Sequence, residues 1–489
     1  MKKIIEVALI IVCLIPLFFI NVKNSHDWGD DFAQYVHQAK NINSGVSQNQ
    51  TGYIFNENCF TGPIAYPVGF PLLLSPIVKF WGLDFYYFNL LQSLFLALSC
   101  LLGFLMIRQY SSFLTAIFVS LIVAYNPMLL NFKTEVISDL SFTFFSMFSL
   151  YLMQKKQNVF LSILLGLLIA FSIHIRSVGV LLVFTYLFNQ VFLQASIRNF
   201  SLKANVNTGI TLFTCILFYL GLKLAWPCNT NYPGFFETEH YWRTVNEHLS
   251  YNLYHLSMFF RGYPVESYWH IGIMASAALL VFALFGVFHF YSENKKSIYV
   301  YYLPVYVLMV ISYKFSHAGM RFLYPVLFLL FLFAVIGLKK AILPWIQKQH
   351  YLALLLGSLV LFSYHEEIQR IQSRETEVLD GPQSKTAVEA FQYINAHIVS
   401  NSIVAFDKPR ALCLYTHVQS FAIFPAANSE QIAEDLKKFK AGYYLSHETQ
   451  STDVLKQYPL QDSSRFKLIY ANADFKLFRI QKNSPNQKM

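Results

Sequence analysis

The sequence predicts a polytopic α-helical membrane protein with about eleven transmembrane helices and a small soluble α/β domain at the C-terminal end. Hydrophobic residues make up 55% of the 489 residues and charged residues only 13%, against about 25% charged residues in soluble domains. Apolar runs recur along residues 1–364, and charged residues gather abruptly after Tyr364. With a mean hydropathy of +0.41, this composition excludes a disordered, collagen-like or ordinary soluble protein.

The first predicted transmembrane helix follows Lys2 and Lys3 and extends from Ile4 to Ile20. The run lacks an A-x-A-like cleavage site and is long enough to cross a bilayer, so we expect an uncleaved helix rather than a signal peptide. The remaining apolar runs are centred near residues 95, 120, 146, 165, 185, 217, 280, 305, 330 and 357.

The net charge is +10, and the basic residues form short clusters between apolar runs. This distribution is explained by the positive-inside rule. No stripe of basic and aromatic residues indicates a nucleic-acid surface. These clusters fall in alternate connections, at Arg108, Lys155, Arg198, Lys295 and Lys339 with their basic neighbours. A cytoplasmic N-terminus makes those connections cytoplasmic. The external connections are then 21–80, 227–269 and 312–321, together with everything after about residue 365.

The six cysteines form no CxxC pair, so neither a zinc site nor a redox motif is indicated. Cys59 and Cys228 both fall in long external connections and could pair in an oxidising compartment. Their pairing stays open, because the sequence does not show whether the two loops approach each other closely enough for a disulfide.

Residues 1–364 are predicted to form the membrane domain, and residues 365–489 an external, periplasmic α/β domain that begins with a charged linker or juxtamembrane helix. Helical spacing of apolar residues predicts a helix over 386–399, and Asn428 with Gln431 resembles a capping box opening a helix over 432–440. Short strands are predicted over 402–406, 411–415, 441–445, 466–471 and 475–480.

Two adjacent carboxylates, Asp30 and Asp31, begin an amphipathic pattern in the first external connection, and Gly45 marks its end. We expect a helix here that lies on the outer membrane surface. One interpretation is that both acids only cap the helix and complement its dipole. The other is that one of them presents a general base to a lipid-bound substrate.

A Pro-rich segment, Tyr66-Pro67-Val68-Gly69-Phe70-Pro71, precedes the second apolar run. Three residues unfavourable to helices within five predict an irregular turn rather than a helix over residues 66–74. The simplest interpretation is a turn that enters the membrane.

These features together resemble the GT-C superfamily of polyprenyl-phosphate-sugar-dependent glycosyltransferases. The resemblance lies in Asp-x-x-x-Tyr at Asp31 and Tyr35 and in the Tyr-Pro-Pro-Gly-Tyr-Pro-like segment at Tyr66, where Val68 replaces a common second Pro. Three further stretches are similar, at residues 126–139, 166–179 and 321–325. The nearest branch contains the protein O-mannosyltransferases and the lipid A aminoarabinose transferase. The resemblance covers roughly residues 1–340.

The resemblance implies a catalytic base for the acceptor and cations for the departing lipid phosphate. Asp31 fits the base position better than Asp30, which is one residue out of register. The implied substrate-binding residues are Arg321 first, then Arg176, Lys314, His317, Arg261, Glu135 and Tyr66. Arg176 could instead anchor a helix end at the interface, and Glu135 and Asp139 could be solvated loop charges. No cofactor is implied, and no H-x-x-x-H-like spacing supports a metal.

The predicted function is therefore transfer of a sugar, with inversion, from a polyprenyl-phosphate donor to a glycan, lipid or protein acceptor on the external face of a bacterial inner membrane. The alternative is a secondary transporter or flippase of lipid-linked or small polar cargo. Such a protein should show inverted repeats and ionisable residues at mid-membrane depth, and neither is clear here. A glycan polymerase or ligase using diphosphate-linked donors is a third possibility. The sequence does not identify the sugar or the acceptor.

Overall fold

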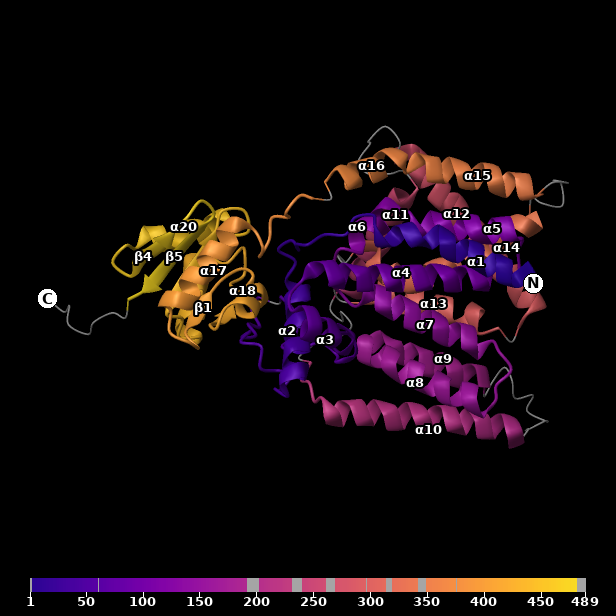
Figure 1. The fold of residues 1–489 in the computed structure, drawn as a ribbon, viewed down its shortest axis with the longest axis horizontal. Helices are drawn as coiled ribbons and strands as arrows, with labels where there is room; N and C mark the ends of the chain where they lie inside the picture. Colours follow the sequence, from indigo (N-terminus) through magenta and orange to yellow (C-terminus); the bar gives the residue numbers. More distant parts are fainter. Residues whose placement is uncertain are drawn as a thin grey trace.

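The computed structural model describes residues 2–59, 61–190, 202–230, 240–260, 269–295, 297–313, 319–341, 349–374 and 376–481. Its larger part is helical, and a five-stranded sheet flanked by helices forms a C-terminal unit (residues 376–481) at one end of the helical part (Figure 1).

Each apolar run expected from the sequence has a helix at its centre, but the α-helix of the first run, predicted to reach Ile20, ends at Leu14. These helices are α1 (Lys2–Leu14), α4 (Phe85–Arg108), α5 (Phe113–Ala124), α7 (Asp139–Met153), α8 (Val159–Ile175), α9 (Val180–Phe188), α10 (Leu202–Ala225), α12 (Trp269–Glu293), α13 (Ile298–Ile311), α14 (Tyr324–Ala341) and α15 (Gln349–Ser363). Within the described residues, four segments are long and apolar enough to cross a membrane: 85–108, 206–225, 272–293 and 320–341. The number of crossings, about eleven, stays a prediction.

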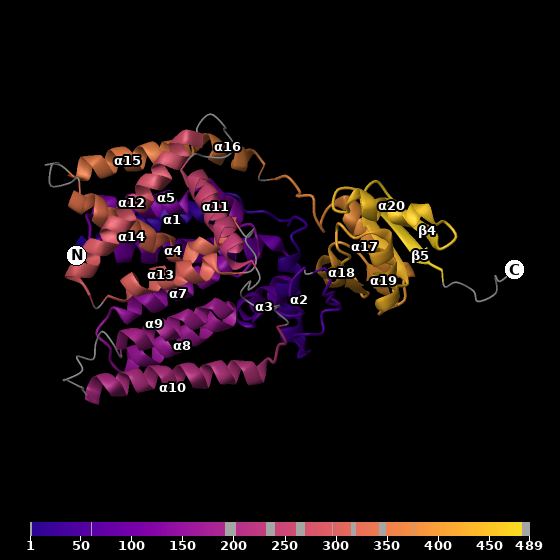
Figure 2. The same cartoon turned by 180° about the vertical axis from the view of Figure 1, so that it is seen from behind.

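Along the chain, shorter elements lie between these helices or after the last of them. They are η1 (Ile15–Phe18), α2 (Asp30–Ser44), α3 (Gly69–Trp81), α6 (Pro127–Phe132), η2 (Ser177–Gly179), α11 (Tyr241–Phe259), η5 (Gly319–Leu323) and α16 (His365–Ser373). The connection 227–269 is thus not a plain loop, because α11 lies within it and packs against α12 (Figure 2).

The helix expected after Asp30 is confirmed. α2 buries Phe32, Val36 and Ala39 on one face, and it ends at Gly45, whose φ of 65° is the left-handed conformation that glycine adopts readily. The irregular turn expected over residues 66–74 is wrong, because α3 begins at Gly69 and contains Pro71. A helix's first turn has no intrahelical acceptors for its N–H groups, so a proline there removes no hydrogen bond.

The C-terminal unit contains β1 (Ile403–Ala405), β2 (Gln419–Phe421), β3 (Tyr443–His447), β4 (Phe466–Ala471) and β5 (Phe475–Ile480), in the sheet order β2-β1-β3-β5-β4. β1 is parallel to β2 and β3, whereas β5 is antiparallel to β3 and β4. The helices are α17 (Lys385–His397), α18 (Pro409–Tyr415), α19 (Ser429–Lys438) and α20 (Asp453–Gln461).

Most local expectations in this unit hold, and one is wrong. The capping box of Asn428 and Gln431 is formed at the start of α19, and the last two strands have the expected bounds. The strand expected over 411–415 is instead α18. Pro409 occupies its first turn, where its fixed φ and missing N–H favour a helix start. The sequence analysis also did not foresee β2 or α20.

The C-terminal unit is joined to the helical part by buried contacts. The Trp28 ring packs edge-on against Phe406 and Phe475 of the C-terminal unit, and its Nε1 donates a hydrogen bond to Asp380. Beside it, the backbone of Ile54 donates to the Ser420 carbonyl at 2.8 Å, so the loop before α3 lies along the free edge of β2. The segment around Tyr53 and Ile54 is therefore hydrogen-bonded to the edge of the sheet.

Gly286 of α12 and Gly337 of α14 lie at a close contact between these two helices, and this contact gives a testable prediction. A Cβ added at Gly337 of α14 would lie 1.9 Å from the Phe282 carbonyl oxygen of α12. Since this neighbour is backbone, Gly337→Ala should destabilise the protein by about 1–3 kcal/mol or more.

The matched control is Gly221→Ala on α10, where an added Cβ meets nothing within 4 Å. There alanine should be neutral or stabilising by up to about 1 kcal/mol, because it is the better helix former. Thermal unfolding in detergent measures both variants, and equal melting temperatures would contradict the close approach of α12 and α14.

Candidate active site

The candidate site forms where the first turn of α2 meets the C-terminal unit. α2 begins at Asp30, and Gly29 at its N-cap donates its backbone N–H to Asp27 Oδ1 at 2.8 Å. The helix packs against α3 on one side and α18 on the other (Figures 1 and 2). Burial of its apolar face leaves Asp30 and Asp31 at the junction between the two parts of the chain.

Arg410 of α18 enters this junction with a fully buried side chain. Its Nη1 donates to Asp31 Oδ1 at 3.1 Å and to the Tyr66 hydroxyl at 3.2 Å, and its Nη2 donates to the Pro63 carbonyl at 3.0 Å. Its Nε lies 3.7 Å from Asp30 Oδ2. One arginine from the C-terminal unit therefore faces both candidate carboxylates.

The chain around Arg410 leaves room for its guanidinium. Gly62 has a φ of +142°, and an added Cβ there would lie 2.0 Å from Arg410 Nη2. The Tyr53 and Tyr66 rings lie 5.0 and 5.3 Å from the guanidinium carbon, within the range of cation–π attraction. The Tyr66 hydroxyl also donates to Asp31 Oδ1 at 2.6 Å.

The second cation at Asp31 is Arg321, which η5 brings from the segment before α14. Its Nη1 lies 3.8 Å from Asp31 Oδ2, and its Nε is buried with no hydrogen-bond partner in the described structure. Arg176, at the end of α8, contacts a different carboxylate: its Nη1 lies 2.5 Å from Asp139 Oδ1. Arg321 thus has unused donor capacity near Asp31, whereas Arg176 is engaged by a buried acid.

The two carboxylates of α2, Asp30 and Asp31, differ in their pKa. Burial tends to raise the pKa of Asp31, but Arg410, Arg321 and the Tyr66 hydroxyl hold it below its ordinary value. Burial raises the pKa of Asp30 to about 6, because the neighbouring cations offset the loss of water only in part. At neutral pH Asp31 is therefore ionised more firmly than its neighbour.

A cavity of about 360 Å³ opens beside these groups, between α2 and the C-terminal unit. Its charged lining includes four carboxylates and two cations. The lining residues are His26, Gly29, Asp30, Asp31, Phe32, Thr61, Glu135, Ile137, Arg321, Asp407 and Lys408. Burial raises the pKa of Asp407 to about 6 and that of Glu135 to about 7. The cavity is large enough for a sugar ring, and its lining favours neutral or cationic groups over additional anions.

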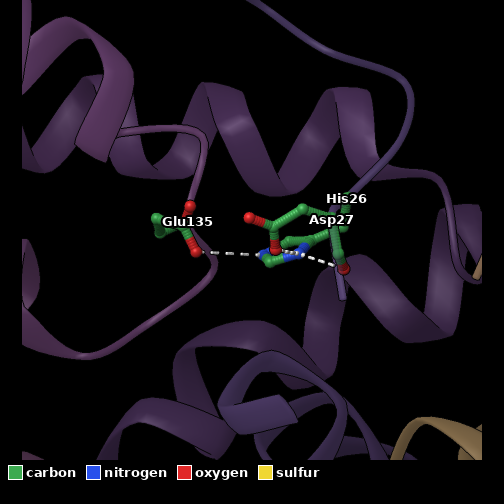
Figure 3. A group of neighbouring side chains, drawn as sticks. All are labelled: His26, Asp27 and Glu135. Atoms are coloured by element: carbon green, nitrogen blue, oxygen red, sulfur yellow. Dashed lines mark hydrogen bonds and ion pairs between the residues drawn. The ribbon is translucent and has the colours of Figure 1, made fainter. Parts of the chain in front are cut away.

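Three ligand-type side chains, His26, Asp27 and Glu135, lie together at the wall of this cavity (Figure 3), with candidate ligand atoms within 4.8 Å of one another. Both ring nitrogens of His26 are already engaged. Nδ1 lies 3.1 Å from Asp27 Oδ1, and Nε2 accepts the Val136 backbone N–H at 3.2 Å. The lone pair of Nε2 is therefore occupied by the Val136 N–H, and a metal ion bound here would have to displace that hydrogen bond or bind the Asp27 and Glu135 carboxylates alone. The arrangement fixes the loop that precedes α2 against the loop between α6 and α7.

The structure places the residues singled out from the sequence as follows. Asp30, Asp31, Glu135 and Arg321 line the cavity, and Tyr66 contacts Asp31 directly. Arg176 pairs with Asp139 instead of Asp31. Lys314, His317 and Arg261 lie outside the described residues.

The disulfide between Cys59 and Cys228 is not formed, because all six cysteines are free. Cys59 is buried near the acidic side chains of the C-terminal unit, whereas the Cys228 thiol lies at the Val68 backbone.

Arg410, Lys408 and Asp407 were missed in the sequence analysis. All three directly follow β1, at the carboxyl end of a parallel strand, where ligand sites of α/β units are commonly found. That position was the available signal, and the wrong strand over 411–415 concealed it.

Comparison with known proteins shows what the chain is similar to. No family model matches the sequence, and no curated protein matches it. The oligosaccharyltransferase of Archaeoglobus fulgidus, in complex with zinc and sulfate, is 10% identical with a TM-score of 0.58, covering 97% of this chain and 73% of that one. ArnT from Cupriavidus metallidurans bound to undecaprenyl phosphate is 12% identical with a TM-score of 0.57, covering 96% and 97%.

A third similar structure is the archaeal oligosaccharyltransferase AglB from Archaeoglobus fulgidus with an inhibitory peptide and a dolichol-phosphate. It is 10% identical with a TM-score of 0.52, covering 91% of this chain and 69% of that one. At such identities the likeness shows the fold alone, and this is the fold expected from the motifs.

The two acids of α2 are expected to affect stability with opposite sign. Because the pKa of Asp30 in the folded chain is about 6, above its ordinary 3.8, ionised Asp30 destabilises the fold above that pH. Asp31 has a lowered pKa, so its stabilising contribution is present above its ordinary pKa and is lost as the pH falls through the lowered one.

Asp30→Asn should therefore raise the melting temperature at neutral pH, and the difference from wild type should disappear by about pH 4. Asp31→Asn should lower the melting temperature, and its difference from wild type should shrink only below about pH 4. Thermal unfolding in detergent across this pH range tests both variants. Shifts of the same sign at neutral pH would show that the two carboxylates have been assigned wrongly.

Proposed function

We propose that the protein is an integral membrane glycosyltransferase that transfers a sugar from a polyprenyl-phosphate donor to an acceptor hydroxyl or amine, with Asp31 as general base. The observation that carries this proposal is the environment of Asp31. Its Oδ1 accepts hydrogen bonds from Tyr66 and Arg410, whereas its Oδ2 lies 3.8 Å from Arg321, beyond hydrogen-bonding distance, at the cavity. An ionised carboxylate oxygen thus remains for a proton beside a cation with unused donors.

The chemistry follows from these two groups. The acceptor oxygen or nitrogen attacks the anomeric carbon, and the bond from that carbon to the phosphate oxygen breaks, with its electron pair leaving on the lipid phosphate. The acceptor's proton goes to Asp31 Oδ2. Arg321 is suited to the departing phosphate, because its planar guanidinium can bind two oxygens. A single displacement inverts the anomeric configuration.

The cavity also bears on the acceptor. Four of its lining side chains are carboxylates, and Arg321, one of its two cations, is assigned to the donor phosphate. This balance supports a neutral or amine-bearing acceptor group over a phosphate acceptor, which would place further negative charge beside Asp30, Glu135 and Asp407. A hydroxyl or amine also requires the base that Asp31 supplies.

The location of the reaction completes the proposal. The positive-inside rule places α2 and the C-terminal unit outside the cytoplasm, and both lie at the same end of the helical part (Figure 1). A polyprenyl-phosphate sugar would present its head group at that interface. The proposed setting is the periplasmic face of a bacterial inner membrane.

Asp31→Asn is expected to lower sugar transfer by about 10²–10⁴-fold, the usual contribution of a general base. The measurement uses the full-length protein in proteoliposomes with radiolabelled polyprenyl-phosphate sugar. Asp453→Asn, at a carboxylate that is 93% exposed on α20, serves as the matched control. Transfer by Asp31→Asn at the wild-type rate would remove Asp31 as the base. Movement of lipid-linked cargo without transfer by the wild type would favour a flippase or transporter.

Arg321→Gln is expected to lower kcat by about 10²–10³-fold, because it removes a cation from the developing phosphate charge. Its melting temperature should change less than its kcat, because Arg321 Nη1 lies 3.8 Å from Asp31 Oδ2, beyond hydrogen-bonding distance. Arg176→Gln is the contrasting variant: it removes the cation that contacts the buried Asp139 directly and should mainly lower the melting temperature. Comparable kinetic losses with unchanged stability in both variants would contradict the assignment of the phosphate to Arg321.

A further inference from the structure

The charge around Asp31 becomes more negative when an anionic donor binds. In the structure, Arg410 is on its Oδ1 and Arg321 is near its Oδ2. Under the proposed function, Arg321 pairs with the donor phosphate, which brings a new negative charge close to Asp31. Both effects favour protonation of Asp31, and a protonated Asp31 cannot act as a base.

Arg410 is placed to oppose this change. It is fully buried, and its Nη1 and Nη2 hydrogen-bond to Asp31, Tyr66 and the Pro63 carbonyl, so the donor has no access to it without unfolding of the junction. It binds the Asp31 oxygen that points away from Arg321. Because Arg410 and the Tyr66 hydroxyl both donate to Oδ1 of Asp31, the carboxylate is held with its other oxygen, Oδ2, at the cavity.

Other groups around Asp31 do not replace Arg410. Arg176 is bound to Asp139, and Asp30 and Glu135 are acids that would repel the charge on Asp31. The titratable and charged groups that face Asp31 are Arg410 of α18, Arg321 of η5, Arg176 after α8, Tyr66 before α3, Asp30 and Tyr35 of α2, Glu135 between α6 and α7, and Tyr313 after α13.

We propose that Arg410 is a positioning residue that keeps Asp31 ionised and directs its Oδ2 to the cavity while the donor phosphate occupies Arg321. The C-terminal unit is then a component of the active site. This inference rests on the proposed function for its role in transfer, but the coupling between Arg410 and Asp31 can be measured without any substrate.

The test compares Arg410→Gln and Arg410→Lys in the full-length protein. The pH profile of kcat, which reports the enzyme with its donor bound, has an acidic limb where the base becomes protonated. Arg410→Gln should move this limb to higher pH by about 1–3 pH units, the usual effect of a neighbouring opposite charge. Arg410→Lys keeps the charge and should hold the limb close to the wild-type position, although the loss of the planar contacts lowers kcat.

Two controls separate this effect from damage to the fold. Arg479→Gln, at an exposed arginine on β5 of the same unit, should leave the profile unchanged. In an Asp30→Asn background the shift caused by Arg410→Gln should persist, because it belongs to Asp31. A lowered kcat with no movement of the acidic limb would overturn the proposal and leave Arg410 a purely structural residue.

A second measurement keeps the inference independent of catalysis. Melting temperatures are followed against pH for Arg410→Gln, for Asp31→Asn and for the double variant. Arg410→Gln should shift the acid loss of stability to higher pH, and Asp31→Asn should abolish that shift. If the wild type transfers no sugar but this coupling is found, the proposed function fails while the Arg410–Asp31 coupling stands. Absence of the coupling overturns the inference even in an active transferase.

Discussion

The buried ion pair between Arg410 and Asp31 joins the two parts of the chain and defines the candidate site. Taking a guanidinium out of water is unfavourable unless its donors find acceptors. Here Asp31, Tyr66 and the Pro63 carbonyl accept from Nη1 and Nη2, whereas Nε has, among the described residues, only the Asp30 carboxylate at 3.7 Å. The surrounding chain is shaped for this contact, through Gly62 beside the guanidinium and the tyrosine rings that face it. The position of α2, the docking of α18 and the cavity between them all depend on this pair.

The same pair explains why two adjacent aspartates have different properties. In place of water, Asp31 has Arg410, Arg321 and the Tyr66 hydroxyl as neighbours. Asp30 is buried, and Arg410 Nε lies 3.7 Å from its Oδ2, compared with 3.1 Å between Arg410 Nη1 and Asp31 Oδ1. Neither residue's neighbours along the sequence distinguish them. The difference arises from which side of the first turn of α2 each one occupies, because that side decides which cations it meets.

Sequence patterns predicted the elements whose causes are local. Gly45 ends α2, the Asn428–Gln431 capping box opens α19, and two short runs give the bounds of β4 and β5. The patterns also led to Asp31, Arg321 and Tyr66, through their resemblance to a known family. They failed at Pro71, which was weighed as a breaker although the first turn of a helix accepts it, and over residues 411–415, where a strand was predicted although Pro409 favours a helix start. The position after β1 was a signal for Arg410, but its contacts were not predictable, because its partners are 344 to 379 positions away in the sequence and no local pattern encodes such a contact.

The distance along the chain between Asp31 and Arg410 also governs how the molecule is made. The ribosome adds Asp31 to the chain long before Arg410, and every apolar helix after α1 is synthesised between them. A nascent or prematurely terminated polypeptide therefore carries the acid without its buried guanidinium. Completion of the last segment during biogenesis, rather than insertion of the helices, is the step that assembles the candidate site.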